Sequence, residues 1–279
     1  MSLDLDRLAA ACGLKRRYHA IDGRLVTAPD EAVAALLRAL GIDPERPQAY
    51  HDAVVPADAA PHAPDDVTCF VPDFLDQGRA WGVTCQLYGL RSSRNWGIGD
   101  FEDLARLGEL VAGFGADFLG VNPLHALFLA DPNAASPFYP ADRNFLNPLY
   151  ITVDRLEGFD AGRDADPARL AALRDGGIID YRAVASCKIE TLRRIFERGS
   201  AAPEGELAAF IAEGGEALQR FALFQAISMD MVSNGMGAGW HSWPDELRDP
   251  QSAAVSRFAR ERRRDVEFQV WLQWAADRQ

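Results

Sequence analysis

The chain has 279 residues, 48% of them hydrophobic, and its 29 Lys and Arg against 41 Asp and Glu give a formal net charge of −12. This balance argues against nucleic acid as a partner, because no basic surface would be left to neutralise phosphates. No segment approaches the roughly 20 apolar residues that span a bilayer, which argues against a membrane protein. The N-terminus also lacks the basic and apolar regions of a signal peptide, so we expect a soluble, cytoplasmic protein.

The first part of the chain is predicted to be helical. Residues 4–12 and 30–40 have the apolar spacing of amphipathic helices, and residues 18–26 between them favour a short extended piece. Residues 43–66 are dominated by Pro, Ala, Asp and His, which is typical of a semi-rigid linker. We therefore treat residues 1–66 as an N-terminal helical segment with its linker.

One βαβ unit is predicted within residues 67–154. Residues 82–90 are a mostly apolar run rich in strand formers, typical of a strand covered on both faces of a parallel sheet. Residues 101–114 place apolar side chains at spacings of three and four, which predicts a helix with one apolar stripe. Residues 118–122 form the second predicted strand, and residues 149–153 are a candidate for a third.

The start of the helix in this unit has two interpretations. Asp100 can cap the helix, with Asp103 as the second half of an imperfect capping box, and we favour this role over a catalytic one. Gly97 and Gly99 resemble the start of a dinucleotide-binding loop. Glu102 occupies the third glycine position, so we reject a Rossmann site.

Two loops follow the carboxyl ends of the predicted strands, where parallel β/α proteins keep their working face. They are residues 91–99 and 122–148, and both are rich in aromatic, amide and guanidinium groups. Aromatic rings pack on the apolar faces of a sugar ring, and the polar groups bind its hydroxyls. His125 is equally suited to substrate contact and to a structural hydrogen bond, whereas Asn147 favours shaping the loop. The candidate sugar-binding residues are Trp96, Asn122, His125, Ser136, Phe138, Tyr139 and Asn147.

The second half of the chain is predicted to be helical. We interpret residues 155–265 as a helical insertion and residues 266–279 as a helix that returns to the sheet. Residues 260–264 are basic, but Glu261 and Asp265 interleave with them, so we predict a salt-bridged surface here. The predicted helices lie at about residues 167–175, 181–198, 204–233 and 251–276.

A loop rich in glycine and tryptophan, residues 234–244, interrupts these helices. Trp240 and Trp243 could belong to a mobile lid that stacks on sugar, or to a turn held by two buried indoles, and we favour the turn.

Four cysteines are scattered without the spacing of metal ligands, which predicts reduced thiols. No metal and no cofactor are expected. The cysteines are Cys12, Cys69, Cys85 and Cys187.

Three motifs in this sequence resemble one known family. They are residues 81–101, residues 120–126, and Ser136-Pro137-Phe138 followed by Asn147-Pro148. They resemble amylomaltases, the 4-alpha-glucanotransferases of glycoside hydrolase family 77 in the α-amylase superfamily. In that family the aromatic ring of a Ser-Pro-Tyr motif stacks on sugar near the cleavage point. Phe138 keeps the ring but lacks the hydroxyl, which Tyr139 next to it would supply.

The resemblance implies a (β/α)₈ barrel that transfers α-1,4-glucan segments between maltooligosaccharides by a retaining mechanism with carboxylate catalysts. In the family these carboxylates lie on later barrel strands, so the resemblance assigns no catalytic residue here. About 200 residues follow the linker, whereas such a barrel takes roughly 250. The apolar helix at 266–276 also ends without a following strand to cover it.

We therefore expect an α/β chain that is a partial barrel, an N-terminal portion of a glucanotransferase that is inactive alone. The alternatives are a non-catalytic module that binds glucan, and an α-1,4-glucan hydrolase. An open strand edge would be covered if two copies paired there, so a homodimer is a further expectation.

Overall fold

The structure is a computed structural model in which the chain divides into two units, residues 1–71 and 72–279. Each unit is described by itself. Residues 46–66 of the predicted linker, and Cys69, lie outside the described residues. The structure describes residues 2–19, 24–40, 42–45, 72–76, 78–199 and 205–279.

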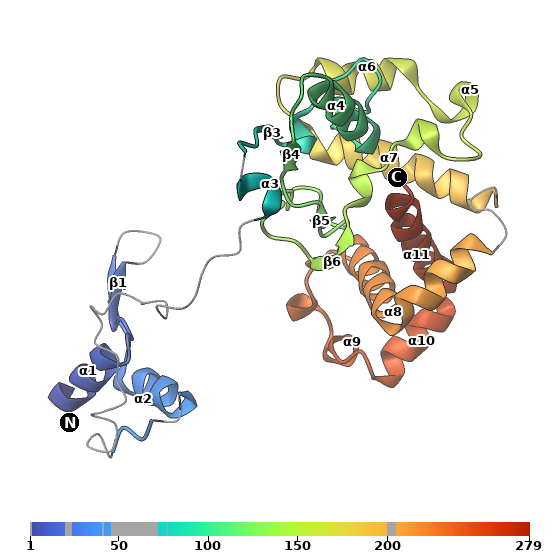
Figure 1. The fold of residues 1–279 in the computed structure, drawn as a ribbon. Helices are drawn as coiled ribbons and strands as arrows, with labels where there is room; N and C mark the ends of the chain where they lie inside the picture. The colour runs from blue at the N-terminus through green and yellow to red at the C-terminus, as the bar shows by residue number, and fades with distance from the viewer. Residues whose placement is uncertain (1, 20–23, 41, 46–71, 77, 200–204) are drawn as a thin grey trace. The chain divides into compact units, whose positions relative to one another are not determined.

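The N-terminal unit is a small helix-and-hairpin fold (Figure 1). Both predicted helices are present, and the predicted extended piece is an antiparallel hairpin. Arg16 forms ion pairs with Asp6 and Asp30 and thereby links the first helix to the second. Leu8, Ala9, Val33 and Leu37 form the core. The elements are α1 Ser2–Ala11, β1 Arg17–His19, β2 Leu25–Thr27 and α2 Asp30–Ala39.

The predicted βαβ unit is confirmed. Strand β3, Gly82–Cys85, pairs in parallel with β4, Phe118–Val121. Helix α4, Phe101–Gly113, connects them and begins with the predicted capping box. Strand β3 is shorter than predicted because the chain turns into a 3₁₀ helix, η2 Leu87–Gly89, where Leu87 N–H donates to the Asn122 side chain. The strands are also half-exposed, whereas the sequence predicted cover on both faces.

The predicted third strand at residues 149–153 is wrong. This segment forms two 3₁₀ turns, η3 Pro148–Tyr150 and η4 Val153–Arg155. Asn147 starts the first turn, because its side-chain oxygen accepts from Leu149 N–H. The apolar side chains of this segment are buried, but the segment is not paired as a strand. A run of buried apolar residues has the same sequence pattern as a buried strand, which explains the wrong prediction.

A hairpin that the sequence did not predict follows β4. Strand β5, His125–Ala126, pairs antiparallel with β6, Asp142–Leu146, and a long loop separates them. The described residues therefore contain three two-stranded sheets together with many helices, a mixed α/β architecture.

The remainder of the larger unit is helical. The sequence predicted α6 at its observed bounds and α7 to within one residue, but the predicted helix at 251–276 breaks at Arg262, where φ is −106° and ψ is 27°. None of the helices in the described ranges combines the length and apolarity that a membrane crossing needs. The helices are α5 Ala161–Asp164, α6 Pro167–Asp175, α7 Tyr181–Glu197, α8 Glu206–Ser233, α9 Asp245–Arg248, α10 Ala253–Glu261 and α11 Arg263–Asp277, and a short 3₁₀ turn, η5, spans Trp240–Ser242.

Helix α11 forms the centre of this region. Every residue from Phe268 to Ala276 is buried, as the apolar composition of this helix predicted. The helix lies against α7 and α8 of the same chain (Figure 1). Strand β6 adds to this cover, because Leu146 N–H donates to Gln273 Oε1 at 2.9 Å and Gln273 Nε2 donates to Leu146 O at 2.9 Å.

Candidate functional site

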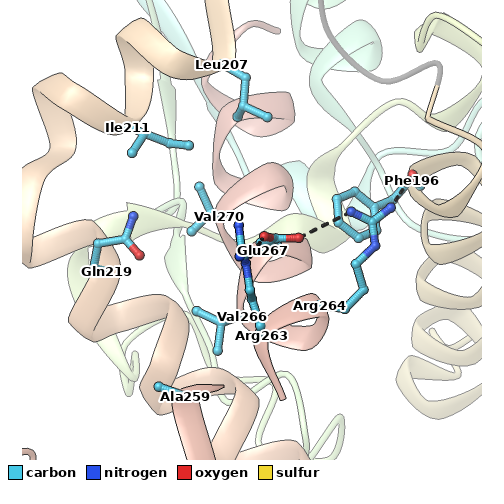
Figure 2. Close-up of a pocket in the computed structure, with 10 residues that line it drawn as sticks. All are labelled: Phe196, Leu207, Ile211, Gln219, Ala259, Arg263, Arg264, Val266, Glu267 and Val270. Carbon is cyan, nitrogen blue, oxygen red and sulfur yellow. Dashed lines mark hydrogen bonds and ion pairs between the residues drawn. The ribbon is translucent and has the colours of Figure 1, made fainter. Parts of the chain in front are cut away.

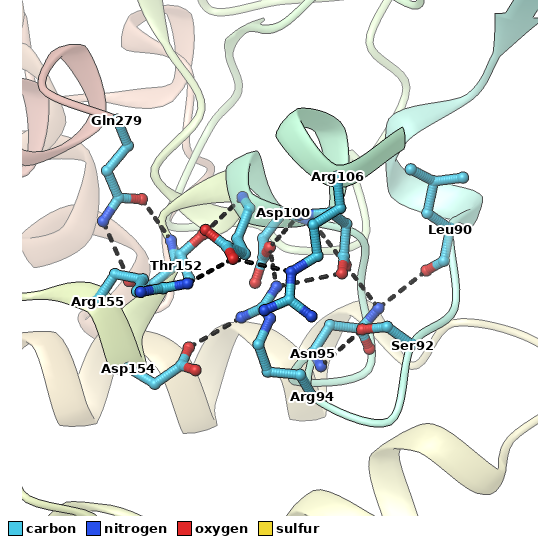
Figure 3. A network of polar contacts seen from close by, with 12 residues as sticks. Leu90, Ser92, Arg94, Asn95, Asp100, Arg106, Thr152, Asp154, Arg155 and Gln279 are labelled. Carbon is cyan, nitrogen blue, oxygen red and sulfur yellow. Dashed lines mark hydrogen bonds and ion pairs between the residues drawn. The ribbon is translucent and has the colours of Figure 1, made fainter. Parts of the chain in front are cut away.

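The loop that follows η2, residues 91–100, is organised around the partly buried guanidinium of Arg94 (Figure 3). Arg94 forms ion pairs with Asp100, with Asp103 at 3.1 Å and with Asp154 at 2.9 Å. Burial disfavours the charged form of Arg94. The hydrogen bond to Asp100 and the three nearby carboxylates outweigh that cost and raise the pKa of Arg94 above its usual value. Arg94 thus joins the loop to α4 and η4.

Trp96 and Asn95, in the same loop, are also buried. Trp96 is 2% exposed, and its ring meets the Phe159 ring edge to face with centroids 6.2 Å apart. Asn95 Nδ2 donates to Asp103 Oδ2 at 2.8 Å and to Leu90 O at 3.1 Å. This loop is therefore a packed support, and Trp96 is covered by protein.

The two glycines of the loop permit close approach of the backbone. A Cβ on Gly99 would lie 1.9 Å from the Leu87 carbonyl oxygen. Gly97 has φ of +81°, and a Cβ there would lie 2.7 Å from the Leu173 side chain. These glycines are explained by packing against η2 and α6, in keeping with the rejection of a dinucleotide site.

Asn122 links the two strand ends. Its Oδ1 accepts from Leu87 N–H at 2.7 Å, and its Nδ2 donates to the Tyr150 hydroxyl at 3.2 Å. Burial raises the pKa of Tyr150 to about 12, so this hydroxyl stays protonated at neutral pH. Asn122 is 9% exposed and acts as a bracket between β4, η2 and η3.

Asn147 and His125 lie on the adjoining hairpin. Asn147 is 3% exposed and its backbone N–H donates to Leu124 O at 2.9 Å, beside His125. His125 begins β5 opposite Leu146 and is partly exposed. Its imidazole makes no hydrogen bond to any residue that the structure describes.

The loop between β5 and β6 presents its aromatic rings to solvent. Tyr139 N–H donates to Ser136 O at 3.1 Å and closes a turn in which Pro137 is buried. Phe138 is 67% exposed and Tyr139 is 82% exposed. We name residues 136–139 the aromatic turn. Two adjacent exposed rings are the kind of surface that packs against a sugar face.

The carboxylates near this turn are engaged in local contacts. Asp131 Oδ1 accepts from Asn133 N–H at 3.2 Å, and Asp142 Oδ1 accepts from Asn144 N–H at 2.8 Å. Asp100 caps α4, as predicted. Within the described part of the chain, no group of three or more His, Cys, Asp or Glu side chains is placed to hold a metal ion. The thiols of Cys12, Cys85 and Cys187 are free.

Two grooves lie among the helices, and residues 136–139 line neither of them. One, of about 480 Å³, is bounded by α7, α8, α10 and α11 (Figure 2). On its wall the Arg264 guanidinium lies 4.0 Å from the Phe196 ring centre. Arg263 and Arg264 both form ion pairs with Glu267, and Arg262 with Asp230, which confirms the predicted salt-bridged surface.

The glycine-rich loop at 234–244 lies beside a second groove of about 330 Å³. Trp243 is 3% exposed, and its indole N–H donates to Gly237 O at 3.0 Å, as the turn interpretation requires. Trp240 is 50% exposed, so only one of the two indoles is buried.

Sequence reasoning did not identify Tyr150 or Lys188 as parts of this site. Tyr150 had been assigned to a strand. Lys188 lies four residues after Val184 and four before Leu192, two fully buried positions of α7. A lysine in the middle of an apolar helical stripe was the available signal.

Comparison with known proteins assigns this chain to a family. Residues 85–279 match the 4-alpha-glucanotransferase family, glycoside hydrolase family 77. A 4-alpha-glucanotransferase of Haemophilus influenzae is 33% identical over 231 residues, which cover 76% of this chain and 33% of that protein. One from Mycobacterium tuberculosis is 36% identical over 223 residues, covering 75% of this chain and 30% of that protein.

A solved structure agrees in fold. The crystal structure of amylomaltase from Corynebacterium glutamicum aligns with a TM-score of 0.61 and 23% identity, covering 100% of this chain and 52% of that one. The chain spans about a third of the length of the two curated relatives. On the match over residues 85–279, the chain belongs to the 4-alpha-glucanotransferase family, glycoside hydrolase family 77.

Proposed function

We propose that this chain is the N-terminal part of an enzyme that cuts α-1,4-glucans and transfers the released glucanosyl group to another maltooligosaccharide. The observation that supports it most directly is the aromatic turn, which lies in the loop that follows the parallel strands β3 and β4. Phe138 and Tyr139 present two large rings to solvent there. Family membership supplies the substrate class.

In the proposed site the seven candidate residues divide by exposure. Ser136, Phe138 and Tyr139 are exposed and His125 is partly exposed, so these contact glucan. Trp96, Asn122 and Asn147 are buried and hold the loops in place. The rings pack on pyranose C–H faces, while the hydroxyls and the imidazole bind sugar hydroxyls.

The proposed fold is the start of a (β/α)₈ barrel, with β3 and β4 as neighbouring strands. Retaining transfer needs a carboxylate nucleophile and a carboxylic acid about 5 Å apart on either side of the glycosidic bond. The acids near the aromatic turn are used in caps, turns and ion pairs. We therefore place the catalytic carboxylates outside these 279 residues. A cytoplasmic location and a homodimer also belong to the proposal.

Incubation of the 279-residue chain with maltotriose, with products separated by length, tests where the chemistry lies. We expect no conversion from a folded preparation. Glucose together with maltopentaose would show that the chain is catalytic and would overturn the placement of the carboxylates. Glucose and maltose without longer products would favour the hydrolase alternative.

Binding tests the glucan surface separately. Titration of the isotope-labelled chain with maltoheptaose should shift NMR signals of the aromatic turn and of His125. Cellohexaose, a β-linked glucan, is the matched control and should shift them far less. Equal or absent shifts with both sugars would contradict the proposed substrate class. Binding without any conversion, even by a longer form of the chain that continues past Gln279, would favour the non-catalytic module.

A further inference from the structure

The chain contains two lysines, and one of them is completely buried. Lys15 is exposed, whereas Lys188 on α7 is 0% exposed. The Lys188 ammonium donates to the Leu149 carbonyl oxygen at 2.6 Å. Its helical neighbours on the same stripe, Val184 and Leu192, are apolar and fully buried. A cation therefore occupies a position where an apolar side chain would fill the helix face.

The charges that face Lys188 come from three elements. Asp100 and Arg94 belong to the 91–100 loop, Asp103 to α4 and Asp154 to η4. Burial is the main cause that lowers the pKa of Lys188 to about 8, opposed by Asp100 and reinforced by Arg94. Tyr150 on η3 stays neutral over this range, because its pKa is about 12. Three carboxylates thus face two cations in one cluster, in which Lys188, Asp100 and Asp103 are buried and Arg94 and Asp154 are partly exposed.

A buried ammonium is costly, and its replacement by an apolar side chain of similar volume is often neutral or stabilising. Stability alone therefore does not account for Lys188. The hydrogen bond to Leu149 O joins α7 to the middle of η3, between Asn147 and Tyr150. Lys188 is therefore a direct link between α7 and that turn.

From η3 two contacts lead to the candidate site. Asn147 N–H donates to Leu124 O, next to His125. The Tyr150 hydroxyl accepts from Asn122, which in turn holds Leu87 N–H. A shift of η3 would move both loops, because each contact is made by a buried side chain or by a paired backbone.

We propose that Lys188 is a positioning residue: by holding the Leu149 carbonyl it fixes η3, and through η3 it sets the geometry of Asn122 and His125. The helical region beyond residue 155 thereby acts on the glucan-contacting loops. Only the effect on glucan affinity rests on the proposed function. The effect on loop geometry is measured without sugar.

The first experiment follows the wild-type chain by NMR. With lysine labelled selectively, the two side chains give two sets of signals, and Lys15 is the internal reference. As pH is raised from about 6 to about 10, Lys188 should lose its proton with a midpoint near 8, well below the ordinary lysine pKa of 10.5. The backbone amides of Leu149 and Leu87 should shift with the same midpoint as Lys188. Amides that do not follow Lys188 would overturn the proposal.

The second experiment compares Lys188→Met with Lys15→Met, the same substitution at an exposed lysine. Amides of Leu149, Asn147 and Leu87 should exchange with solvent about tenfold faster in Lys188→Met alone, with Leu272 of α11 unchanged. Acceleration everywhere would indicate a purely structural lysine, and acceleration nowhere would also contradict positioning. If Lys188→Met does not fold, the wild-type titration decides.

Glucan affinity is the last readout. Lys188→Met should bind maltoheptaose about tenfold more weakly than the wild type, whereas Lys15→Met should bind equally well. Unchanged affinity in Lys188→Met would show that η3 does not govern the glucan surface. If the wild type itself binds no maltoheptaose, the proposed function fails, while the amide measurements still test Lys188.

Discussion

Two loops follow the ends of β3 and β4, and their aromatic side chains differ in exposure. Residues 91–100 contain arginine, asparagine and tryptophan, but the loop is closed around an ion-paired guanidinium, and Trp96 is buried. Residues 127–141 place Phe138 and Tyr139 in solvent.

The difference shows that a loop with side chains suited to binding sugar does not necessarily expose them to a sugar. In the first loop the polar side chains are paired with other protein groups, and these contacts hold the loop in place. In the second loop the turn at Ser136 to Tyr139 is closed by backbone, which leaves its side chains unused. We therefore expect the first loop to contribute stability and the second loop, in the proposed function, to contribute contact with glucan. The predictions below separate these contributions.

The largest effect is expected for Arg94→Met. Removing the guanidinium leaves Asp100 and Asp103 buried without their cation, which should cost about 3 to 5 kcal/mol of unfolding free energy. Arg106→Met is the matched control, because Arg106 forms an exposed helical pair with Glu102, and should cost less than about 0.5 kcal/mol. Urea unfolding of both variants gives the comparison. Equal losses would show that the first loop is not held by this cluster.

The free energy of unfolding should depend on pH through the protonation of Lys188. Its pKa is about 8 in the folded chain against an ordinary value of 10.5, so the folded state binds this proton more weakly. Below pH 8 the cost of the buried charge is fully present. As pH rises from 8 to 10.5 that cost is relieved, and stability should increase by about 3 kcal/mol.

Urea unfolding across this range, with Lys188→Met as the reference, isolates the contribution of the one group. The difference in unfolding free energy between the two proteins should change steadily between pH 8 and 10.5. A constant difference would contradict the lowered pKa.

Asn122→Ala tests the bracket between the strand ends. The substitution leaves the Leu87 N–H and the Tyr150 hydroxyl without their partner, so we expect a loss of about 2 to 3 kcal/mol. Asn144→Ala serves as the control, since Asn144 is exposed and should change stability by less than about 0.5 kcal/mol. Thermal unfolding monitored by circular dichroism suffices. A stable Asn122→Ala chain that loses sugar binding would instead support direct contact.

The smallest effect on stability is expected at the aromatic turn. Phe138→Ala and Tyr139→Ala should each change the unfolding free energy by less than about 0.5 kcal/mol, because both rings are exposed. The double variant should bind maltoheptaose about tenfold more weakly, since the stacking surface is gone. Phe114→Ala, which removes a ring that is 74% exposed at the C-cap of α4, should leave binding unchanged. Full affinity in the double variant would place the glucan surface elsewhere.

Much of the secondary structure could be predicted, because the signals are local. The capping residues Asp100 and Asp103 fixed the start of α4, and Asp166 with Pro167 explains why α6 begins where predicted. The errors have non-local causes. Residues 149–153 have the apolar pattern of a strand, but they pair with no strand in the described part of the chain. The break at Arg262 lies between α10, which packs with Trp243, and α11, which packs with α7 and α8.

The sequence by itself determined the family, the helices and the βαβ unit, because long ordered motifs, caps and apolar periods are properties of neighbouring residues. The tertiary structure alone decided which candidate side chains meet solvent. Trp96 is covered because Phe159 lies against it, and Lys188 meets Leu149 because α7 lies beside η3. Exposure depends on segments that are far apart in the chain, and no local pattern encodes which of them pack together.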